Sequence, residues 1–207
     1  RLVGRESFRR FVQDFGFGRA SGITLDSEVA AVISSLDRRG EIYSMTASFG
    51  QGITVTPLQL AAAFGALANN GTLMRPAIVA ERRQADGRVV PTQPQAVRQA
   101  VTGRTASTIT GMLVQAVEGV YDHKAKLPGY YVAGKTGTAQ IADPAGGYGQ
   151  DVHHTFAGYF PAYQPRFVIL VKLDRPSKVK HAADSTTVIF RQLAEFLVDY
   201  YQLPPQR

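Results

Sequence analysis

Apolar and polar residues alternate most regularly, with the period of an α-helix, between residues 53 and 71. The residues that share one helix face there are Leu60, Phe64 and Leu67. Thr56 can cap this helix, the proline that follows has its backbone angle already fixed, and Gln59 can bond back to the cap. Asn-Asn-Gly closes the segment, so the sequence predicts a buried helix over 57–69.

Three other segments have helical periodicity, at residues 6–15, 105–118 and 184–201. The first would bury Phe8, Phe11, Val12 and Phe15. The second would bury Ile109, Met112, Leu113 and Ala116. The third would turn Val188, Ile189, Leu193, Phe196, Leu197 and Tyr200 toward a sheet. Residues 16–50 show only brief apolar pairs, which predicts a connection rich in loops.

The remaining pattern predicts β-structure at residues 130–141, 155–160 and 166–174. The connection between the last two strands is long enough for an antiparallel pair but too short for a parallel crossover. A further exposed hairpin is expected at residues 79–91, around an Asp-Gly dipeptide that suits a type I′ turn. The predicted fold class is therefore α/β of the α+β kind, with an antiparallel sheet covered by helices.

Composition limits the classes of protein that remain. The 207 residues suffice for one domain, and 44% of them are apolar, as in a folded globular protein. The absence of cysteine excludes disulfides, a thiolate nucleophile and thiolate metal ligands. The longest nearly apolar run, residues 60–68, is too short to span a membrane. The chain begins with Arg1 rather than Met, which we expect to reflect processing or an artificial boundary.

The chain carries 23 Lys and Arg against 16 Asp and Glu, a formal charge of +7. Such a surplus favours anionic surroundings such as lipid head groups, nucleic acid or an acidic cell-wall polymer. The densest basic cluster consists of Arg175, Lys178, Lys180 and His181. It is short and has no interleaved aromatic residues, so solvated loop charge explains it better than a nucleic-acid site. No nucleic-acid partner is expected.

The histidines do not predict a metal centre or a general base. His153 and His154 are consecutive in an expected strand, so they point to opposite faces and cannot share a metal ion. Surface or ladder roles are expected for both. His123 and His181 lie in polar connections without Asp or Glu at ligand spacing. We therefore expect no metal and no other cofactor.

The triplet Gly134-Lys135-Thr136 has two chemical interpretations. With Gly129 it matches the G-x-x-x-x-G-K-[ST] pattern of a phosphate-binding loop. That loop needs a strand before its first glycine and a helix that begins near the lysine. Here the preceding residues are polar, the supposed loop contains strand-forming Tyr and Val, and a later glycine and proline leave no room for the helix. Nucleotide binding is therefore disfavoured.

The second interpretation is a Lys-Thr-Gly strand beside a cleft, a motif of class A β-lactamases and penicillin-binding proteins. An ammonium there can hold a substrate carboxylate or favour ionisation of a nearby hydroxyl, and threonine hydroxyls add directed donors. Gly137 lacks a Cβ, so a substrate can lie against the backbone. The triplet alone is weak evidence, because an exposed strand end with a solvated Lys135 has the same sequence.

The surrounding sequence strengthens the strand interpretation. Four stretches share the order and spacing of one family. They are Phe-Gly-Phe-Gly at 15–18, Ser-Phe-Gly-Gln-Gly-Ile-Thr-Val-Thr-Pro-Leu-Gln-Leu at 48–60, Ala-Asn-Asn-Gly at 68–71, and residues 133–140 around the triplet. Together they resemble monofunctional, class B penicillin-binding proteins, especially the division-type D,D-transpeptidases, over nearly the whole chain. The second stretch is much more specific than the triplet.

The resemblance implies a peptidoglycan D,D-transpeptidase with the penicillin-binding/serine β-lactamase-like fold. Such an enzyme attacks the D-Ala-D-Ala end of a stem peptide with a serine, releases D-Ala and passes the acyl group to an amine, and β-lactams trap its serine. The resemblance also implies that Lys135 supports catalysis near the serine of a second motif. Thr136, Gly137 and Thr138 would bind substrate, and the Thr138 N–H would be an oxyanion donor. A periplasmic, membrane-associated location is implied, with division or elongation proteins as partners.

Two motifs of that family are missing upstream of Lys135. Ser-x-x-Lys, which carries the nucleophile, occurs only at residues 177–180 in a basic connection, where we interpret it as coincidence, and Ser-x-Asn does not occur. We therefore expect residues 1–207 to be the C-terminal portion of a single transpeptidase domain, inactive alone. The N-terminal half of that domain would be its partner, and the membrane anchor would lie outside this chain.

Two alternatives remain open at this point. A non-catalytic descendant would keep the scaffold to bind peptidoglycan or division proteins, and a serine β-lactamase would share the Lys-Thr-Gly motif. One further feature is a glycine-rich stretch around Tyr148 at residues 146–149. It suggests either a flexible loop that gates the cleft or a disordered surface loop.

Overall fold

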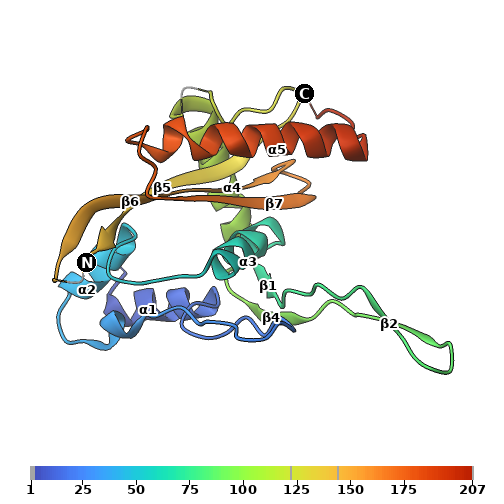
Figure 1. The fold of residues 1–207 in the computed structure, drawn as a ribbon, viewed down its shortest axis with the longest axis horizontal. Helices are drawn as coiled ribbons and strands as arrows, with labels where there is room; N and C mark the ends of the chain where they lie inside the picture. Colours follow the sequence, from blue (N-terminus) through green and yellow to red (C-terminus); the bar gives the residue numbers. More distant parts are fainter. Residues whose placement is uncertain (1–2, 122, 144, 207) are drawn as a thin grey trace.

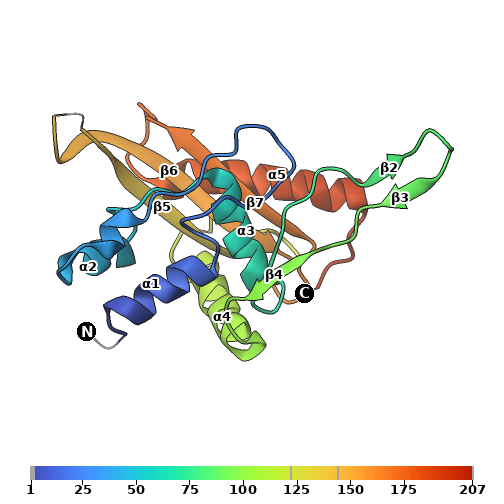
Figure 2. The ribbon, with the colours of Figure 1, turned by 90° about the horizontal axis from the view of Figure 1, so that it is seen from below.

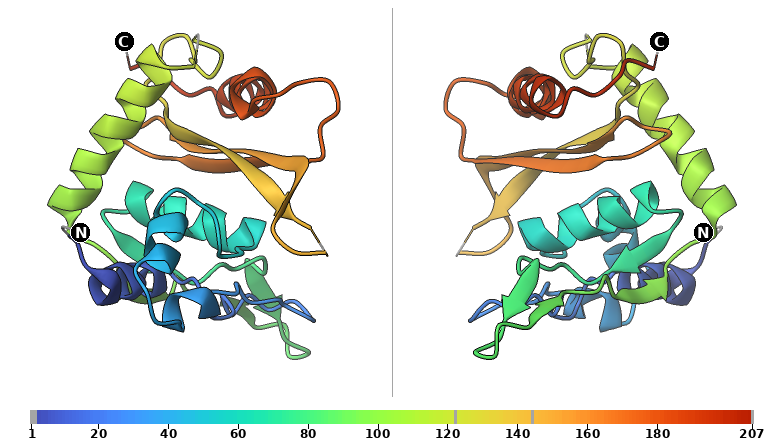
Figure 3. Two further views of the ribbon diagram at one scale, coloured as in Figure 1. Left: turned by 90° about the vertical axis from the view of Figure 1, so that its left-hand side faces the viewer. Right: turned by 90° about the vertical axis from the view of Figure 1, so that its right-hand side faces the viewer.

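The computed structural model describes residues 3–121, 123–143 and 145–206. Its elements form layers on either side of a three-stranded sheet (Figure 1). Helix α5 covers one face, helix α3 and the N-terminal elements cover the other, and α4 runs along one side (Figure 3). The bounds are β5 Ala133–Ala142, β6 Tyr148–Phe160, β7 Phe167–Asp174, α3 Pro57–Ala68, α4 Gly103–Gly119 and α5 Thr186–Tyr201. The predicted mixed fold with an antiparallel sheet is confirmed.

The sheet has the strand order β5-β6-β7, and both neighbouring pairs are antiparallel, as predicted for the last two. β6 begins at Tyr148 rather than at 155, because its first half is polar and largely exposed and gives no apolar alternation. β5 begins at Ala133 rather than at 130, because a turn precedes it. In that turn the Tyr130 N–H donates to the Leu127 carbonyl at 3.1 Å, and Gly129 between them has a φ of 81°.

Each face of the sheet carries a hydrophobic core. On the α5 face, Phe156 is fully buried, and its ring centroid lies 4.7 Å from that of Phe190. On the opposite face, Tyr159 is fully buried among side chains of α3 and α4. Its hydroxyl lies 2.6 Å from the Thr110 hydroxyl of α4. Burial raises the pKa of Tyr159, so the phenol stays neutral and its hydrogen bond fixes α4 against the sheet.

Helix α3 begins as its sequence predicts. Thr56 Oγ1 accepts a hydrogen bond from the Gln59 N–H at 3.2 Å, and the Thr56 N–H donates to Gln59 Oε1 at 3.1 Å. This reciprocal cap, with proline at the first helical position, is confirmed. The buried residues, however, are Gln59, Ala63 and Ala66, while Leu60, Phe64 and Leu67 are only partly buried.

Helices α4 and α5 exist as predicted, and part of each predicted face packs against the core. The predicted residues that are partly buried there are Leu113, Ala116, Ile189 and Leu197. The fully buried residues lie beside them. The residues that α4 buries are Ala106, Thr110, Val114 and Val117, and those that α5 buries are Thr186, Thr187, Phe190 and Ala194. Of the residues predicted to point inward, Met112, Val188, Leu193, Phe196 and Tyr200 are exposed. Both helices have apolar residues on two adjacent faces. The fit of each face to the sheet decides which residues become fully buried, and on α5 that face includes the large Phe190.

The first half of the chain contains more structure than its sequence predicts. The predicted helix at 6–15 is present as α1, yet none of its described residues is buried and Phe11 is exposed. Residues 16–50, expected to be loops, include helix α2 and a 3₁₀ turn. Two short strands, β1 and β4, form an unpredicted antiparallel pair. The bounds are α1 Arg5–Asp14, the 3₁₀ turn Ser34–Asp37, α2 Ile42–Ser48, β1 Thr72–Met74 and β4 Ala96–Gln99.

The predicted exposed hairpin is present and projects from the molecule as an arm (Figure 2). Its strands are β2, Glu81–Arg83, and β3, Val89–Pro91. The predicted type I′ turn is wrong, because that turn needs positive φ at both residues of the Asp-Gly pair, and of the two only Gly87 has it, at 82°. The Gly87 N–H donates to the Gln84 carbonyl at 3.0 Å. The hairpin loop therefore has three residues, 85–87, and Gly87 is the last of them.

Candidate active site on the Lys-Thr-Gly strand

Lys135, Thr136, Gly137 and Thr138 lie in extended conformation in the first half of β5. The strand interpretation of the triplet is therefore confirmed, and the disfavoured phosphate-loop interpretation is excluded, since that loop needs a helix at the lysine. Within the part of the chain that the structure describes, β5 pairs with β6 alone. The other edge of β5, which we call the open edge, therefore has backbone groups available for a ligand.

The backbone of Thr136 points to the open edge. The Thr136 N–H donates to the Tyr121 hydroxyl at 3.4 Å, and the Thr136 carbonyl accepts from the Lys135 ammonium at 3.0 Å. In an antiparallel strand, the N–H and C=O of one residue point to the same side, and the residue two positions further repeats that direction. Thr138 therefore directs its N–H and its carbonyl to the same edge.

The Lys135 side chain is exposed and folds back along the open edge. Its Nζ atom lies 3.0 Å from the Thr136 carbonyl oxygen and 3.5 Å from Thr136 Oγ1. Neighbouring residues of a strand point to opposite faces, so the ammonium reaches the Thr136 hydroxyl only by passing around the strand edge. An ammonium and a hydroxyl thus meet at the open edge, and together they suit a carboxylate.

Gly137 and Thr138 also have partners within the fold. The Thr138 hydroxyl accepts a hydrogen bond from the Ala182 N–H at 3.3 Å. A Cβ on Gly137 would lie 2.5 Å from the Thr155 hydroxyl of β6, so packing inside the sheet favours glycine at this position. The sequence interpretation assigned this glycine to substrate approach. The structure adds a packing reason that operates without any substrate.

The two consecutive histidines point to opposite faces of the sheet, as predicted. His153 is half-buried, and its Nδ1 lies 3.0 Å from Asp174 Oδ1 of β7. His154 is fully buried and hydrogen-bonded, so it has no surface role, but it pairs with Thr138 and Leu173 in the strand ladder, which fits the expected ladder role. Within the described residues, no three potential metal-ligating side chains gather in one group.

Two contributors to this site carry no sequence motif. Tyr121 and Ala182 come from connections that lie 15 and 44 residues from the groups that they contact. Only the folded chain brings them to β5, so no local pattern could have identified them. The single Ser-x-x-Lys match, residues 177–180, lies in a connection of bends and not at the start of a helix.

Replacing Tyr121 by phenylalanine should loosen the Thr136 backbone without unfolding the chain. The ring keeps its edge-on contact with Phe156, at a centroid distance of 6.0 Å, and only the hydroxyl is lost. We expect a stability loss of about 1 kcal/mol and faster hydrogen exchange of the Thr136 amide. Tyr163→Phe, at an exposed tyrosine, should leave that amide unchanged. Equal protection of Thr136 in both variants would contradict the assigned hydrogen bond.

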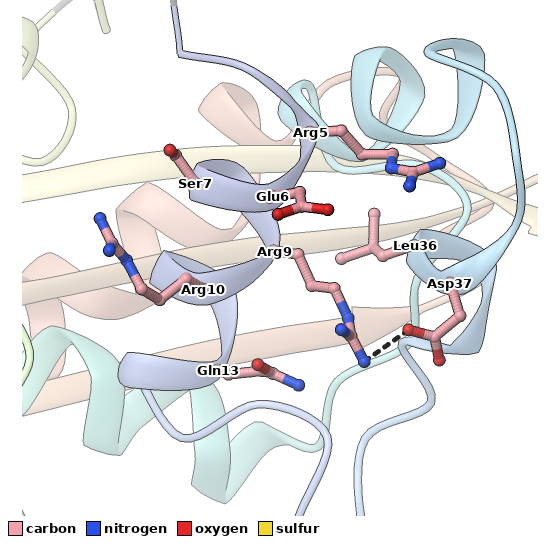
Figure 4. Close-up of a pocket in the computed structure, with 8 residues that line it drawn as sticks. All are labelled: Arg5, Glu6, Ser7, Arg9, Arg10, Gln13, Leu36 and Asp37. Carbon is pink, nitrogen blue, oxygen red and sulfur yellow. Dashed lines mark ion pairs between the residues drawn. The ribbon is translucent and has the colours of Figure 1, made fainter.

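A cavity of about 480 Å³ lies between α1 and the 3₁₀ turn (Figure 4). Its lining residues are Arg5, Glu6, Ser7, Arg9, Arg10, Gln13, Leu36 and Asp37. Arg9 and Asp37 form an ion pair at 2.6 Å, with exposed side chains. None of the lining residues belongs to β5, so this cavity is separate from the Lys-Thr-Gly site.

A Lys-Thr-Gly triplet on a strand, in a mixed fold whose last helix covers the sheet, is a feature of the penicillin-recognising serine enzymes. The model of the family described as "Penicillin binding protein transpeptidase domain" matches residues 1–195 of this chain. The chain therefore belongs to the penicillin-binding protein transpeptidase family, and the class B resemblance of its motifs is confirmed.

Several known proteins are similar to this chain. Stage V sporulation protein D of Bacillus subtilis is 36% identical over 177 residues, which cover 84% of this chain and 27% of that protein. PbpB of Mycolicibacterium smegmatis is 32% identical over 214 residues, or 98% of this chain and 33% of that protein. The crystal structure of penicillin binding protein 3 from Mycobacterium tuberculosis with ampicillin has a TM-score of 0.88 at 31% identity. That match covers 98% of this chain and 47% of the other. The chain thus spans roughly a third or less of these curated relatives.

Proposed function

We propose that this chain forms the Lys-Thr-Gly wall of a peptidoglycan D,D-transpeptidase that cross-links stem peptides through a serine acyl-enzyme and is trapped by β-lactams. The observation that carries the proposal is the open edge of β5, where the Lys135 ammonium, the Thr136 hydroxyl and the Thr138 backbone occur together. No Ser-x-x-Lys precedes β5 in these 207 residues, so the nucleophile belongs to a segment outside them. Residues 1–207 are then the C-terminal portion of one domain.

The stem peptide lies along the open edge as an added strand, and its terminal carboxylate accepts hydrogen bonds from Lys135 and from the threonine hydroxyls. The serine attacks the carbonyl carbon of the scissile bond, and the Thr138 N–H donates a hydrogen bond to the oxygen of that carbonyl. This bond strengthens as the carbonyl becomes tetrahedral, because negative charge develops on that oxygen. As the serine Oγ–C bond forms, the C–N bond to the terminal D-Ala breaks, and the proton of the serine hydroxyl leaves on the D-Ala amine. An amine of a neighbouring strand later takes the acyl group and returns a proton to the serine oxygen.

The position of the complete protein in the cell is part of the proposal. In the described part of the chain, no helix combines the length and apolar character needed to cross a bilayer. We place the complete protein at the extracytoplasmic face of a bacterial membrane, held there by a segment outside this chain. Division or elongation membrane proteins are its further proposed partners.

A fluorescent penicillin gel tests the proposal. The chain alone should show no covalent label, because its own serines are not the nucleophile. Mixed with the segment encoded upstream of Arg1, it should give a labelled band on that segment, and excess unlabelled penicillin should abolish the band. Labelling of the isolated chain would contradict the proposal. No label in the mixture would indicate a non-catalytic scaffold, and rapid hydrolysis of penicillin would indicate a β-lactamase.

A further inference from the structure

A buried histidine links the sheet to the connection between β7 and α5. His154 is 0% exposed and lies opposite Thr138 in the pairing of β6 with β5. Its Nδ1 lies 3.0 Å from Ser185 Oγ, and its Nε2 lies 3.2 Å from the Lys180 carbonyl oxygen. One side chain therefore holds both ends of the segment from 180 to 185, which we call the anchored segment.

The partners of His154 fix its tautomer. The Lys180 carbonyl only accepts hydrogen bonds, so Nε2 carries the proton and donates it. In the neutral ring Nδ1 is then the acceptor, and the Ser185 hydroxyl donates to it. Both ring nitrogens of this buried imidazole are satisfied, which restricts the anchored segment to one position relative to β6.

That position brings the anchored segment to the Lys-Thr-Gly strand. The Ala182 N–H, at the middle of the segment, donates to Thr138 Oγ1 at 3.3 Å. This bond occupies one acceptor site of the hydroxyl and leaves its proton free to be donated. A carboxylate accepts hydrogen bonds and donates none, so a Thr138 hydroxyl arranged in this way favours an anionic ligand group.

A second contact holds the same segment from the other side. Asp184 forms an ion pair with Lys124, which follows α4, and the Lys124 hydrogen bond lowers the pKa of Asp184. The carboxylate therefore stays charged, and the ion pair persists when the histidine contact is removed. Variants of His154 or Ser185 should for this reason shift the segment without releasing it.

We propose that His154 is a positioning residue for carboxylate recognition. Through Lys180 and Ser185 it sets the place of the Ala182 N–H, and this N–H sets the donor direction of the Thr138 hydroxyl. The inference rests on the proposed function in one respect, namely that Thr138 contacts the carboxylate of a stem peptide or β-lactam. The placement of the anchored segment depends only on the geometry.

The kinetic test compares a penicillin with its methyl ester, which lacks the carboxylate charge, on the domain assembled from this chain and its upstream segment. Three variants are needed. His154→Leu removes both hydrogen bonds, Ser185→Ala removes one hydroxyl, and His154→Gln keeps an N–H for the Lys180 carbonyl. We expect His154→Leu to slow acylation by the acid about 10-fold, the size of one lost charge-assisted bond, and to slow acylation by the ester about 2-fold or less. Ser185→Ala should give a smaller selective loss, and His154→Gln should restore most of the rate.

A merely structural role would slow acylation by the acid and by the ester equally, and that result would overturn the proposal. Unchanged rates with both compounds would overturn it as well.

If the assembled wild-type domain is not acylated at all, the proposed function fails and the positioning is tested separately. Long-range ¹H–¹⁵N spectra of the 207-residue chain should then show the Nε2-protonated tautomer of His154. Ser185→Ala should move the Thr138 amide resonance while leaving amides of β2 and β3 in place. An Nδ1-protonated ring, or an unmoved Thr138 resonance, would overturn the positioning itself.

Discussion

Replacement of Lys135 by alanine is expected to slow acylation of the assembled transpeptidase by penicillin about 100-fold. The Lys135 ammonium supplies positive charge at the open edge of β5, 3.0 Å from the Thr136 carbonyl oxygen and 3.5 Å from its hydroxyl. Its loss removes a charge-assisted hydrogen bond from an anionic ligand and leaves the hydroxyl without its neighbouring cation. The rate constant for labelling by a fluorescent penicillin, measured over a range of concentrations, gives the effect directly.

Lys172 offers a matched control for this substitution. It is an exposed lysine of β7, opposite Thr155, which in turn lies opposite Gly137 of β5. Two strand spacings, about 10 Å, separate it from the Lys-Thr-Gly strand. Lys172→Ala removes the same charge from the same sheet, and at that distance we expect acylation to change about 2-fold or less. Equal losses in the two variants would point to general charge attraction, and no loss in either would remove Lys135 from the site.

Features that depend on neighbouring residues were predictable from the sequence. The start of α3 follows from a threonine cap, a proline and Gln59, all within one turn, and the structure contains that cap. The antiparallel pairing of β6 with β7 follows from a connection too short for a crossover. Lys135 could be placed on a strand because strand-forming residues precede it and no helix can follow it.

Features that depend on the distance between elements were not predictable in the same way. A helical period shows which residues share a face, but α5 has an aromatic face at Phe196 and Tyr200 next to the face that it buries with Phe190. Which of the two faces packs inward depends on the shape of the sheet beneath it, and one sequence without relatives does not encode this as a pattern. The contact of Thr138 with Ala182 has the same origin, since it needs the whole sheet in place.

Phe156→Ala is expected to lower the free energy of unfolding by about 3–5 kcal/mol, the largest effect on stability among these substitutions. The ring is fully buried, with centroids 4.7 Å from Phe190 and 6.0 Å from Tyr121. A Cβ on Gly134 would lie 2.4 Å from the Phe156 ring, so the ring fills the space beside the residue that precedes Lys135. Alanine would leave a cavity there that a close-packed core fills only in part.

Phe196→Ala is the control, because it also removes a phenyl ring, but from a residue of α5 that is 62% exposed. The expected change in the free energy of unfolding is below about 0.5 kcal/mol. Urea unfolding followed by circular dichroism separates the two outcomes. The cavity lies next to Gly134, so Phe156→Ala should also speed hydrogen exchange of the Lys135 amide more than that of amides in β7. Similar losses of stability in both variants would contradict the inward face assigned to α5. A small loss confined to Phe156→Ala, with exchange at Lys135 unchanged, would mean that the Lys-Thr-Gly strand is held from its open edge rather than from the core beneath it.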